Sequence, residues 1–326
     1  MDQLELLREL SEPNDTKIVL LVLDGIGGLP LQPGGKTELE TARTPNLDAL
    51  ARESSCGLMD IVAPGITPGS GPGHLALFGY HPVKYIVQRG ALAAAGIDFV
   101  QEPGDVAARA NFCTVDEAGN VLDRRAGRIP TEESAPLCEL LEKEVKVEGV
   151  QVFVRPVKEH RALVVFRGEG LSDALHDTDP QQTGVPPLEP QVTEESAAAR
   201  RTAQVVAEFL RQVREILRGK HPKANMMLMR GFALKPDLPQ FADVYKLRAA
   251  AEATYPMYRG LARLVGMEIL PPRQTVAEEF EEVATQWDKF DFFFVHIKKT
   301  DSTGEDGDFD AKVAVIEAVD ADLPKL

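Results

Sequence analysis

The chain has 326 residues and a formal net charge of −15, with 44% hydrophobic and 27% charged residues. This composition is that of a folded globular protein and excludes a disordered or fibrous one. The length predicts two domains, one of them inserted into the other. The negative charge argues against a broad surface for nucleic acid, so a local arginine cluster must attract any anionic substrate.

The cysteines and the apolar segments indicate the cellular compartment of the protein. Cys56, Cys113 and Cys138 form no C-x-x-C pair, and an odd count without zinc-type spacing indicates reduced thiols. The N-terminal MDQLELLREL lacks an apolar signal segment, and runs such as 18–23 are too short to cross a membrane. We therefore expect a cytoplasmic protein that binds neither membrane nor nucleic acid. The sequence does not indicate the oligomeric state.

The N-terminal part has the pattern of an α/β domain. KIVLLVLDGIGG (17–28) is an apolar run that ends in Asp24 and glycines, which is typical of a strand buried on both faces. Thr44-Pro45 then begins a helix, and a Gly/Pro-rich loop (63–74) leads into another helical segment. This order favours a largely parallel sheet.

The middle of the chain alternates in the manner of antiparallel strands. Residues 111–125 are predicted to form a hairpin, 150–157 and 160–168 a second strand pair, and 195–217 a long amphipathic helix. These elements predict a smaller α+β domain, inserted into the first.

The α/β pattern then resumes. The expected elements are a helical stretch at 248–265 kinked at Pro256, a short strand at 267–270, a helix at 275–290 and a buried strand at 291–297. We therefore expect one domain of residues 1–85 and 245–326, interrupted by an inserted domain of residues 86–244.

Asp24 is the first candidate site residue. It follows a buried strand, where ligands of open α/β sheets bind, and a carboxylate among glycines can ligate a divalent cation. A plain turn aspartate is an equally good interpretation of this residue alone. The surrounding glycines match neither G-x-G-x-x-G nor a P-loop. Ile26 stands where an aspartyl-phosphate enzyme would carry a second acid.

Ser70 is the second candidate, in the segment PGSGPGH, where the loop enters a helix. Backbone N–H groups at a helix N-terminus bind phosphate, so a serine there could receive a phosphoryl group. Such a serine needs a base or a metal ion to become a nucleophile, and His74 lies four residues further on. An ordinary turn serine is the competing interpretation.

Two charged segments complete the candidates. Carboxylates follow the strand 291–297 and repel one another unless a cation lies among them: Asp301, Glu305, Asp306, Asp308 and Asp310, of which Asp310 is expected to be solvated. Asp123, Arg124, Arg125 and Arg128 form DRRAGR, an arginine cluster that suits a phosphorylated acid unless it is merely a solvated face. Further cationic candidates are Arg161, Arg230 and Lys298. HDTDPQQTG (176–184) is expected to be an ordinary Asx-turn loop.

Six segments follow one another between about residue 17 and the C-terminus: VLDGIGG, TPNLDAL, TPGSGPGHLALFGY, DRRAGR, HDTDP and HIKKTDSTGEDGDFD. Together they resemble the archaeal-type, cofactor-independent phosphoglycerate mutases of the alkaline phosphatase superfamily. The resemblance implies an α/β, alkaline-phosphatase-like core with a largely parallel sheet and a smaller inserted α+β domain that holds the substrate.

The resemblance also implies the chemistry. Ser70 would take the phosphoryl group of 3-phosphoglycerate and return it to the neighbouring oxygen to give 2-phosphoglycerate, without 2,3-bisphosphoglycerate. Two divalent metal ions would assist, Mn²⁺ foremost, with Mg²⁺, Co²⁺ or Zn²⁺ as alternatives. Asp24 and Ser70 would contact one metal ion, and Asp301 and Glu305 the other. The implied substrate-binding residues are Asp123, Arg124, Arg125, Arg128, Arg230 and Lys298.

Two departures from the family pattern bear on this expectation. Glu305 stands where the family has a histidine, which makes the metal site harder and more anionic. The family's later Asp-His pair and further histidine have no counterpart before Leu326. The sequence is therefore expected to be truncated at its C-terminus, and we expect weak metal binding and little activity from this chain alone.

Two alternative functions remain open. One is another phosphomutase or a phosphate-ester hydrolase of the same superfamily, which a comparison of 3-phosphoglycerate with ribose 1-phosphate would distinguish. The other is a non-catalytic phosphate-binding relative, against which phosphoserine at Ser70 would argue.

Overall fold

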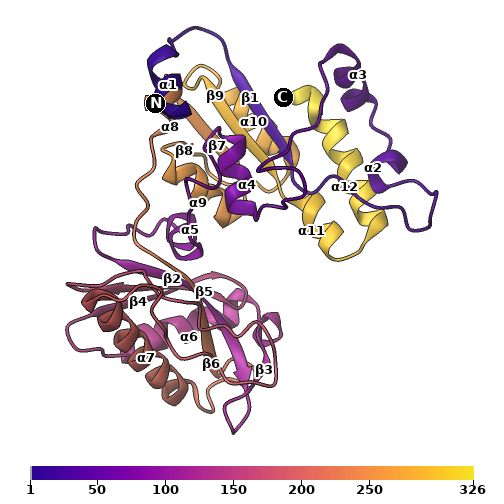
Figure 1. Cartoon of the computed structure of the whole chain (residues 1–326). Coiled ribbons are helices and arrows are strands. Elements are labelled where there is room, and N and C mark those ends of the chain that lie inside the picture. Colours follow the sequence, from indigo (N-terminus) through magenta and orange to yellow (C-terminus); the bar gives the residue numbers. More distant parts are fainter. Residues whose placement is uncertain (1) are drawn as a thin grey trace. The chain divides into compact units, whose positions relative to one another are not determined.

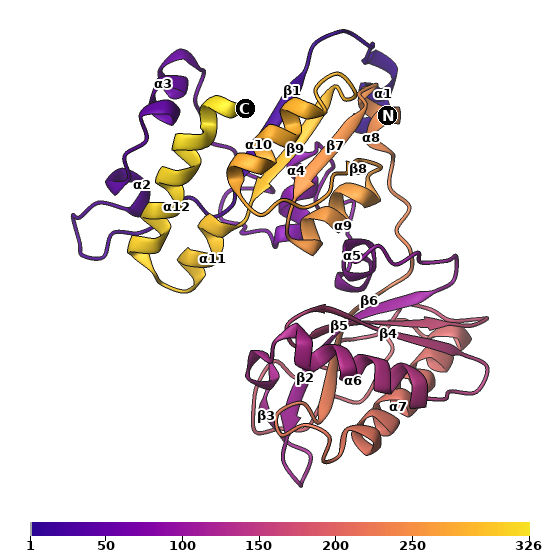
Figure 2. The same ribbon diagram turned by 180° about the vertical axis from the view of Figure 1, so that it is seen from behind.

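The computed structural model describes residues 2–326, which fold into two compact units (Figures 1 and 2). Unit 1 comprises the chain up to Tyr85 together with Leu238–Leu326, and unit 2 comprises Ile86–Asp237. The sequence predicted the first boundary at 85/86 and the second at 244/245.

Unit 1 is built on a parallel sheet of four strands in the order β1-β9-β7-β8. The strands are β1 (Ile18–Leu23), β9 (Phe292–Ile297), β7 (Ala249–Ala253) and β8 (Glu268–Ile269). The predicted α/β class with a parallel sheet is confirmed for this unit. Because the strands are parallel, the residues that follow β1 and β9 emerge at the same edge of the sheet.

Helices cover both faces of this sheet (Figure 2). On one face, Phe280 and Val283 of α10 pack with Phe293 and Val295 of β9. On the other face, α4 and α9 approach the alternate residues of β9, so that Phe78 contacts Phe294. The helices are α1 (Gln3–Leu10), α2 (Glu38–Thr41), α3 (Pro45–Glu53), α4 (Ser70–Leu77), α8 (Phe241–Tyr245), α9 (Pro256–Leu264), α10 (Val276–Thr285), α11 (Lys299–Glu305), α12 (Phe309–Asp322) and the short η2 (Leu323–Lys325).

The helix predicted over 248–265 was wrong in its first part. Residues 249–253 form β7, which lies between β9 and β8 with all five residues buried. Alanine favours helices, but pairing with two neighbouring strands outweighs that weak preference. Pro256 occupies the first turn of α9, where a proline has no hydrogen bond to lose, and so does not kink a helix.

Unit 2 is built on an antiparallel sheet in which β3, β2, β5 and β4 follow one another and β6 also pairs with β2. Its strands are β2 (Val106–Val115), β3 (Val121–Asp123), β4 (Gln151–Lys158), β5 (Arg161–Arg167) and β6 (Met226–Ala233). Its helices are α5 (Arg89–Gly96), η1 (Ala126–Arg128), α6 (Thr131–Glu144) and α7 (Ala197–Leu217). The predicted hairpin, second strand pair and long helix are all present.

The two faces of the unit 2 sheet have different partners. On one face, β-strand residues such as Phe166 pack against α6 and α7, for example on Phe209. On the other face, α5 places Ala93 and Ala94 against Leu163 and Val165, and Phe99, Phe153 and Val157 pack against this cluster. Among residues 2–326 no helix combines the length and apolarity that a membrane span requires.

Candidate active site

Asp24 lies directly after β1 and is held from several sides. Its backbone N–H donates to Ile297 O at 3.0 Å, and its Oδ2 accepts a 2.6 Å hydrogen bond from the Tyr258 hydroxyl. Lys298 Nζ lies 3.3 Å from the same oxygen. Burial alone would raise the pKa of Asp24, but polar contacts with His296, Tyr258 and Lys298 outweigh it and hold the pKa well below its usual range. Asp24 is therefore an anion at neutral pH.

Ser70 is the first residue of α4, as the sequence predicted, and its side chain is exposed. The Ser70 side chain is near enough to the Tyr258 hydroxyl to lower the pKa of Tyr258 against the larger effect of burial, and that hydroxyl donates to Asp24. Tyr258 therefore links the two residues that the sequence assigned to one site. The position at the start of α4 also places Ser70 where the partial positive charge of a helix favours a phosphate.

Two buried histidines lie behind these residues. His74 Nδ1 is 2.8 Å from Ser70 O, and because a carbonyl can only accept, Nδ1 carries the proton. Burial lowers the pKa of His74 to about 4, so its Nε2, which has no hydrogen-bond partner among the described residues, is an unprotonated nitrogen. The His296 ring lies 5.0 Å from the His74 ring and 3.7 Å from the Tyr258 ring.

Lys298 joins the two predicted metal-ligating aspartates. Its ammonium contacts both Asp24 and Asp301, and these carboxylates raise its pKa in spite of its burial. Gly25 has a φ of +63°, and a Cβ there would lie 2.6 Å from Asp301 Oδ1. Only a glycine therefore lets the chain after β1 approach the start of α11 so closely. Asp301 lies in the helix α11, and Glu305 ends this helix with an exposed side chain.

These residues fit a divalent cation in part. Asp24 and Asp301 already share a positive charge, the ammonium of Lys298, and hard oxygen ligands suit Mn²⁺ or Mg²⁺. Among residues 2–326, however, no group of three or more His, Cys, Asp or Glu side chains is arranged to hold a metal ion. The described residues thus offer carboxylates for a cation but no complete coordination shell.

Unit 2 carries a second group of candidates on the sheet face that α5 covers only partly. Arg109 of β2 pairs in register with Arg230 of β6, and Asn111 pairs with Arg161 of β5. Because side chains two residues apart share a face, these four lie together. Like charges directly opposite each other are destabilising, so this arrangement favours the binding of an anion. Asn111 is buried, and its Oδ1 has no hydrogen-bond partner among the described residues.

Further arginines surround this face. Burial lowers the pKa of His160 to about 4, and the nearby charges of four arginines act in the same direction. Arg89, the first residue of α5, has a lowered pKa through burial and through the charge of Arg230. We call the following residues the arginine cluster: Arg89, Arg109, Arg125, Arg128, Arg161 and Arg230.

The segment DRRAGR forms a tight turn. Asp123 accepts hydrogen bonds from the backbone N–H groups of Arg125 at 2.8 Å and Gly127 at 2.6 Å. Ala126, Gly127 and Arg128 all have positive φ, at 48°, 62° and 52°. The predicted substrate residue Asp123 thus shapes the turn, while Arg125 and Arg128 project exposed side chains.

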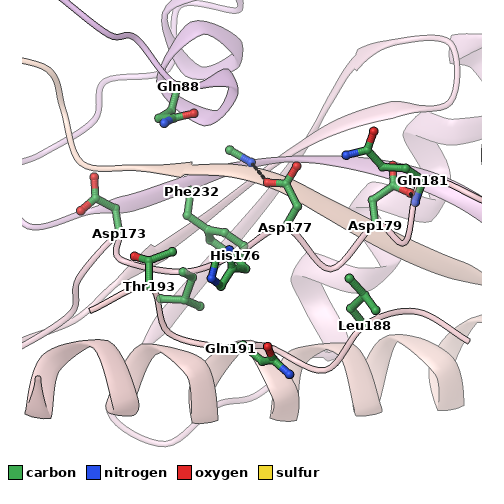
Figure 3. A pocket seen from close by; sticks show the side chains of 12 residues that line it. Gln88, Asp173, His176, Asp177, Asp179, Gln181, Leu188, Gln191, Thr193 and Phe232 are labelled. Carbon is green, nitrogen blue, oxygen red and sulfur yellow. Dashed lines mark hydrogen bonds between the residues drawn. The ribbon is translucent and has the colours of Figure 1, made fainter. Parts of the chain in front are cut away.

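The HDTDP segment forms the predicted Asx turn and also makes ion pairs with two arginines. The Asx turn is present, since Gln181 N–H donates to Asp179 Oδ1 at 2.9 Å. Asp179 also forms a bidentate ion pair with Arg124 at 2.8 and 2.7 Å, and Arg230 Nη1 lies 3.7 Å away. Asp177 and Asp179 line a cavity of about 600 Å³ together with His176 (Figure 3).

Several residues of these groups were not predicted from the sequence. Tyr258 gave no signal because it lies in a helix far from any recognised motif. His296 stands within the quoted segment HIKKTD, and the alternation of a strand would have placed it on one face with Phe294. Arg89 and Arg109 are isolated in sequence and meet the other arginines only through the pairing of β2 with its neighbours.

Comparisons with known proteins agree with this picture. Residues 51–223 match the family model described as 2,3-bisphosphoglycerate-independent phosphoglycerate mutase. Curated relatives named as probable members include one from Thermus thermophilus, 51% identical, and one from Thermotoga neapolitana, 53% identical. Each alignment covers 100% of this chain and 80% of the relative, so the chain spans about four fifths of their length.

Solved structures show the same relationship. A cofactor-independent phosphoglycerate mutase from Thermoplasma acidophilum is 30% identical, with a TM-score of 0.68 over 95% of this chain and 83% of that one. A protein from Pyrococcus horikoshii is 25% identical, with a TM-score of 0.77 over 95% of this chain and 77% of that one. The extent and identity of these matches mean that the chain belongs to the archaeal-type 2,3-bisphosphoglycerate-independent phosphoglycerate mutase family.

Proposed function

We propose that this chain interconverts 3-phosphoglycerate and 2-phosphoglycerate, as a glycolytic isomerase, through a phosphoserine at Ser70. The observation that carries the proposal is the link from Ser70 through the Tyr258 hydroxyl to Asp24. A nucleophilic serine needs a fixed geometry and a means of losing its proton, and this chain of hydroxyl and carboxylate groups supports both.

The reaction consists of two phosphoryl transfers. In the first, a bond forms between Ser70 Oγ and phosphorus while the bond from phosphorus to the C3 oxygen breaks. The leaving oxygen then takes up the proton that Ser70 has lost. In the second, the C2 hydroxyl loses its proton as its oxygen bonds to the phosphorus of the phosphoserine, the bond to Oγ breaks, and Oγ takes up a proton in turn. No water and no second phosphorylated cofactor enter this sequence.

Metal ions belong to this proposal through the predicted ligands. Asp24 and Ser70 would hold one divalent cation, and Asp301 and Glu305 the other, with Mn²⁺ as the foremost candidate. Such ions neutralise charge on the transferring phosphoryl group. Lys298 contacts both Asp24 and Asp301, and once a divalent cation has displaced it from them its ammonium would provide further positive charge for the phosphoryl group.

The arginine cluster would retain the substrate. A phosphoglycerate carries a phosphate and a carboxylate, and guanidinium groups bind both through paired N–H donors. The exposed Arg125 and Arg128 suit first contact, and the half-buried Arg230 suits a deeper one. A hydrolase has no need to keep its dephosphorylated product, so this cluster supports a mutase over a phosphatase.

The proposal extends to fold and location. The parallel sheet, with Asp24 after β1 and Asp301 after β9, supports an alkaline-phosphatase-like core in unit 1. Cys56, Cys113 and Cys138 are all free thiols, which supports a reducing, cytoplasmic setting.

The deciding experiment incubates the chain with 3-phosphoglycerate and millimolar Mn²⁺, removes the Mn²⁺ with a chelator and identifies the products by ³¹P NMR, together with mass spectrometry of the protein. We expect 2-phosphoglycerate and a phosphate on Ser70, both lost in Ser70→Ala. Release of inorganic phosphate alone would indicate a hydrolase, and turnover of ribose 1-phosphate another mutase. Binding without turnover in saturating Mn²⁺ would indicate a non-catalytic relative.

A further inference from the structure

Asp179 is a buried carboxylate that forms ion pairs with two arginines, Arg124 and Arg230. Its side chain is 0% exposed, yet its pKa lies below the usual range because contacts with Arg124, Gln181 and Arg230 outweigh the effect of burial. Arg124 Nε and Nη2 bind its two oxygens in a fork, and Arg230 Nη1 lies 3.7 Å from Oδ2. Arg124 follows β3 and Arg230 belongs to β6, so one carboxylate joins two separate strands.

The same turn fastens β6 on both sides of Arg230. Asp177 accepts from Gly231 N–H at 2.7 Å and from Arg230 Nε at 3.2 Å (Figure 3 shows the first of these bonds). Thr178 N–H donates to Met229 O, and Met229 N–H donates to the Thr178 hydroxyl, both at 2.9 Å. The backbone and the side chain of Arg230 are therefore both fixed by three consecutive residues of the turn.

This fixation has a consequence for the guanidinium groups. A guanidinium has five N–H donors, and Arg124 uses two of them on Asp179, which sets the plane in which the others point. Repulsion by the other members of the arginine cluster would otherwise push the Arg230 side chain away from them into solvent. A buried counter-charge that binds through a fork opposes that spreading and leaves outward donors for a ligand.

We infer that Asp179, supported by Asp177, is a positioning residue that sets Arg124 and Arg230 for the binding of phosphoglycerate. This inference rests on the proposed function, because it takes phosphoglycerate as the ligand of Arg124 and of the arginine cluster. Asp179 itself does not touch the substrate and acts through the two guanidinium groups.

Unit 2 contains a matched control for this inference. Asp105 is also buried and forms the same fork with Arg167, at 2.8 and 2.6 Å. Arg167 ends β5, whereas Arg161 begins it, about 20 Å away at the usual rise of a strand. Asp105→Asn therefore removes an equivalent buried ion pair without touching the arginine cluster.

The test is calorimetric titration of the chain with 3-phosphoglycerate in the wild type, Asp179→Asn and Asp105→Asn, with thermal unfolding of each. A loss of about 10- to 100-fold in affinity is expected for Asp179→Asn, since small displacements of binding groups have effects of this order. Asp105→Asn should bind within about twofold of the wild type although it is similarly destabilised. Equal affinities in the two variants would overturn the inference.

A spectroscopic readout makes the test independent of stability. The Nε–H resonance of Arg124, assigned with Arg124→Lys, should exchange slowly with water in the wild type and in Asp105→Asn, but rapidly in Asp179→Asn. An unchanged resonance in Asp179→Asn would contradict the positioning role. A wild-type chain that does not bind 3-phosphoglycerate would instead refute the proposed function, and the role of Asp179 with it.

Discussion

The Tyr258 hydroxyl donates a 2.6 Å hydrogen bond to Asp24 and lies near the Ser70 side chain, which lowers the pKa of Tyr258. Burial and the neighbouring Asp24 carboxylate raise the pKa of Tyr258, so it remains a neutral hydroxyl throughout the physiological range. A neutral hydroxyl can hold a serine and a carboxylate in a fixed arrangement without adding charge to the site. Tyr258 thus connects the surroundings of Ser70 with the Asp24 carboxylate.

Removal of this hydroxyl should slow the phosphoryl transfer. Tyr258→Phe removes the hydroxyl that binds Asp24 beside Ser70, and we expect kcat for 2-phosphoglycerate formation to fall about 100-fold with little change in KM. Tyr245→Phe is the control, because it removes a 2.9 Å bond to Phe78 O in the same unit. The role of Tyr258 would be refuted by equal kcat values in the two variants under saturating Mn²⁺.

Manganese should bind this chain weakly and through the two aspartates. A divalent cation has to displace Lys298 from Asp24 and Asp301, and among residues 2–326 no group of three ligands awaits it. Thermal-shift titration should therefore saturate at millimolar rather than micromolar Mn²⁺. Asp24→Asn and Asp301→Asn should abolish the shift, whereas Asp310→Asn, on an exposed residue, should retain it. Saturation at micromolar Mn²⁺ would show that the site is complete.

Gly25 should be intolerant of any side chain. The Cβ of an alanine at this position would lie 2.6 Å from Asp301 Oδ1, which is a steric clash. The backbone at this position also has a φ of +63°, which a residue with a side chain rarely adopts. Gly34 has a similar φ of +79° but open space around it, so Gly34→Ala reports the backbone strain alone. We expect Gly34→Ala to cost about 1 kcal/mol and Gly25→Ala about 2 to 4 kcal/mol in the free energy of unfolding, since displacement of Asp301 adds to the strain. Similar values from denaturant titration would argue against a close contact.

Glu252 should make the protein less stable as the pH rises. Glu252 lies in β7 with 1% of its surface exposed, and both carboxylate oxygens lack hydrogen-bond partners among the described residues. Burial raises its pKa to about 8, and the negative charges of Glu279 and Glu282 act in the same direction. The positive charges of Arg273 and Arg259 oppose this increase. The unfolded chain loses this proton near pH 4.5, whereas the folded chain keeps it to about pH 8. The free energy of unfolding therefore falls between these values.

Glu252→Gln should remove this loss. We expect no difference from the wild type at pH 4.5 and a gain of about 2 to 4 kcal/mol at pH 8, measured by urea titration. Glu281→Gln, an exposed change on α10, should shift stability by less than about 0.5 kcal/mol at either pH. A pH-independent difference for Glu252→Gln would contradict a buried neutral carboxyl group.

Local sequence patterns predicted most helices and strands, but not the tertiary contacts between them. The apolar run before Asp24 and the Pro/Gly loop before Ser70 identify a strand end and a helix start, because those signals lie within a few residues. The strand β7 escaped prediction because its five residues, AAAEA, carry a helical preference that only pairing with β9 and β8 overrides.

Long-range contacts explain the rest. Tyr258 reaches Asp24 across 234 positions of sequence, and no local pattern records such a partner. The arginine cluster draws its members from α5, η1 and three strands, so DRRAGR alone could suggest a cationic site but not its extent. The ion pair between Arg124 and Asp179 likewise needed the pairing of β2 with β3 and β6, which brings two turns together.

The turn at Ala126–Arg128 has a bearing on how a ligand would be bound. Three successive residues in left-handed conformations are rarely adopted by a free chain, and the two that are not glycine cost about 1 to 3 kcal/mol each. That cost is met when unit 2 folds, with the help of the two hydrogen bonds to Asp123. The loop that carries Arg125 and Arg128 is therefore preorganised, because its backbone conformation is fixed before an anion binds. The affinity for the anion is then not reduced by the entropy cost of ordering a mobile loop.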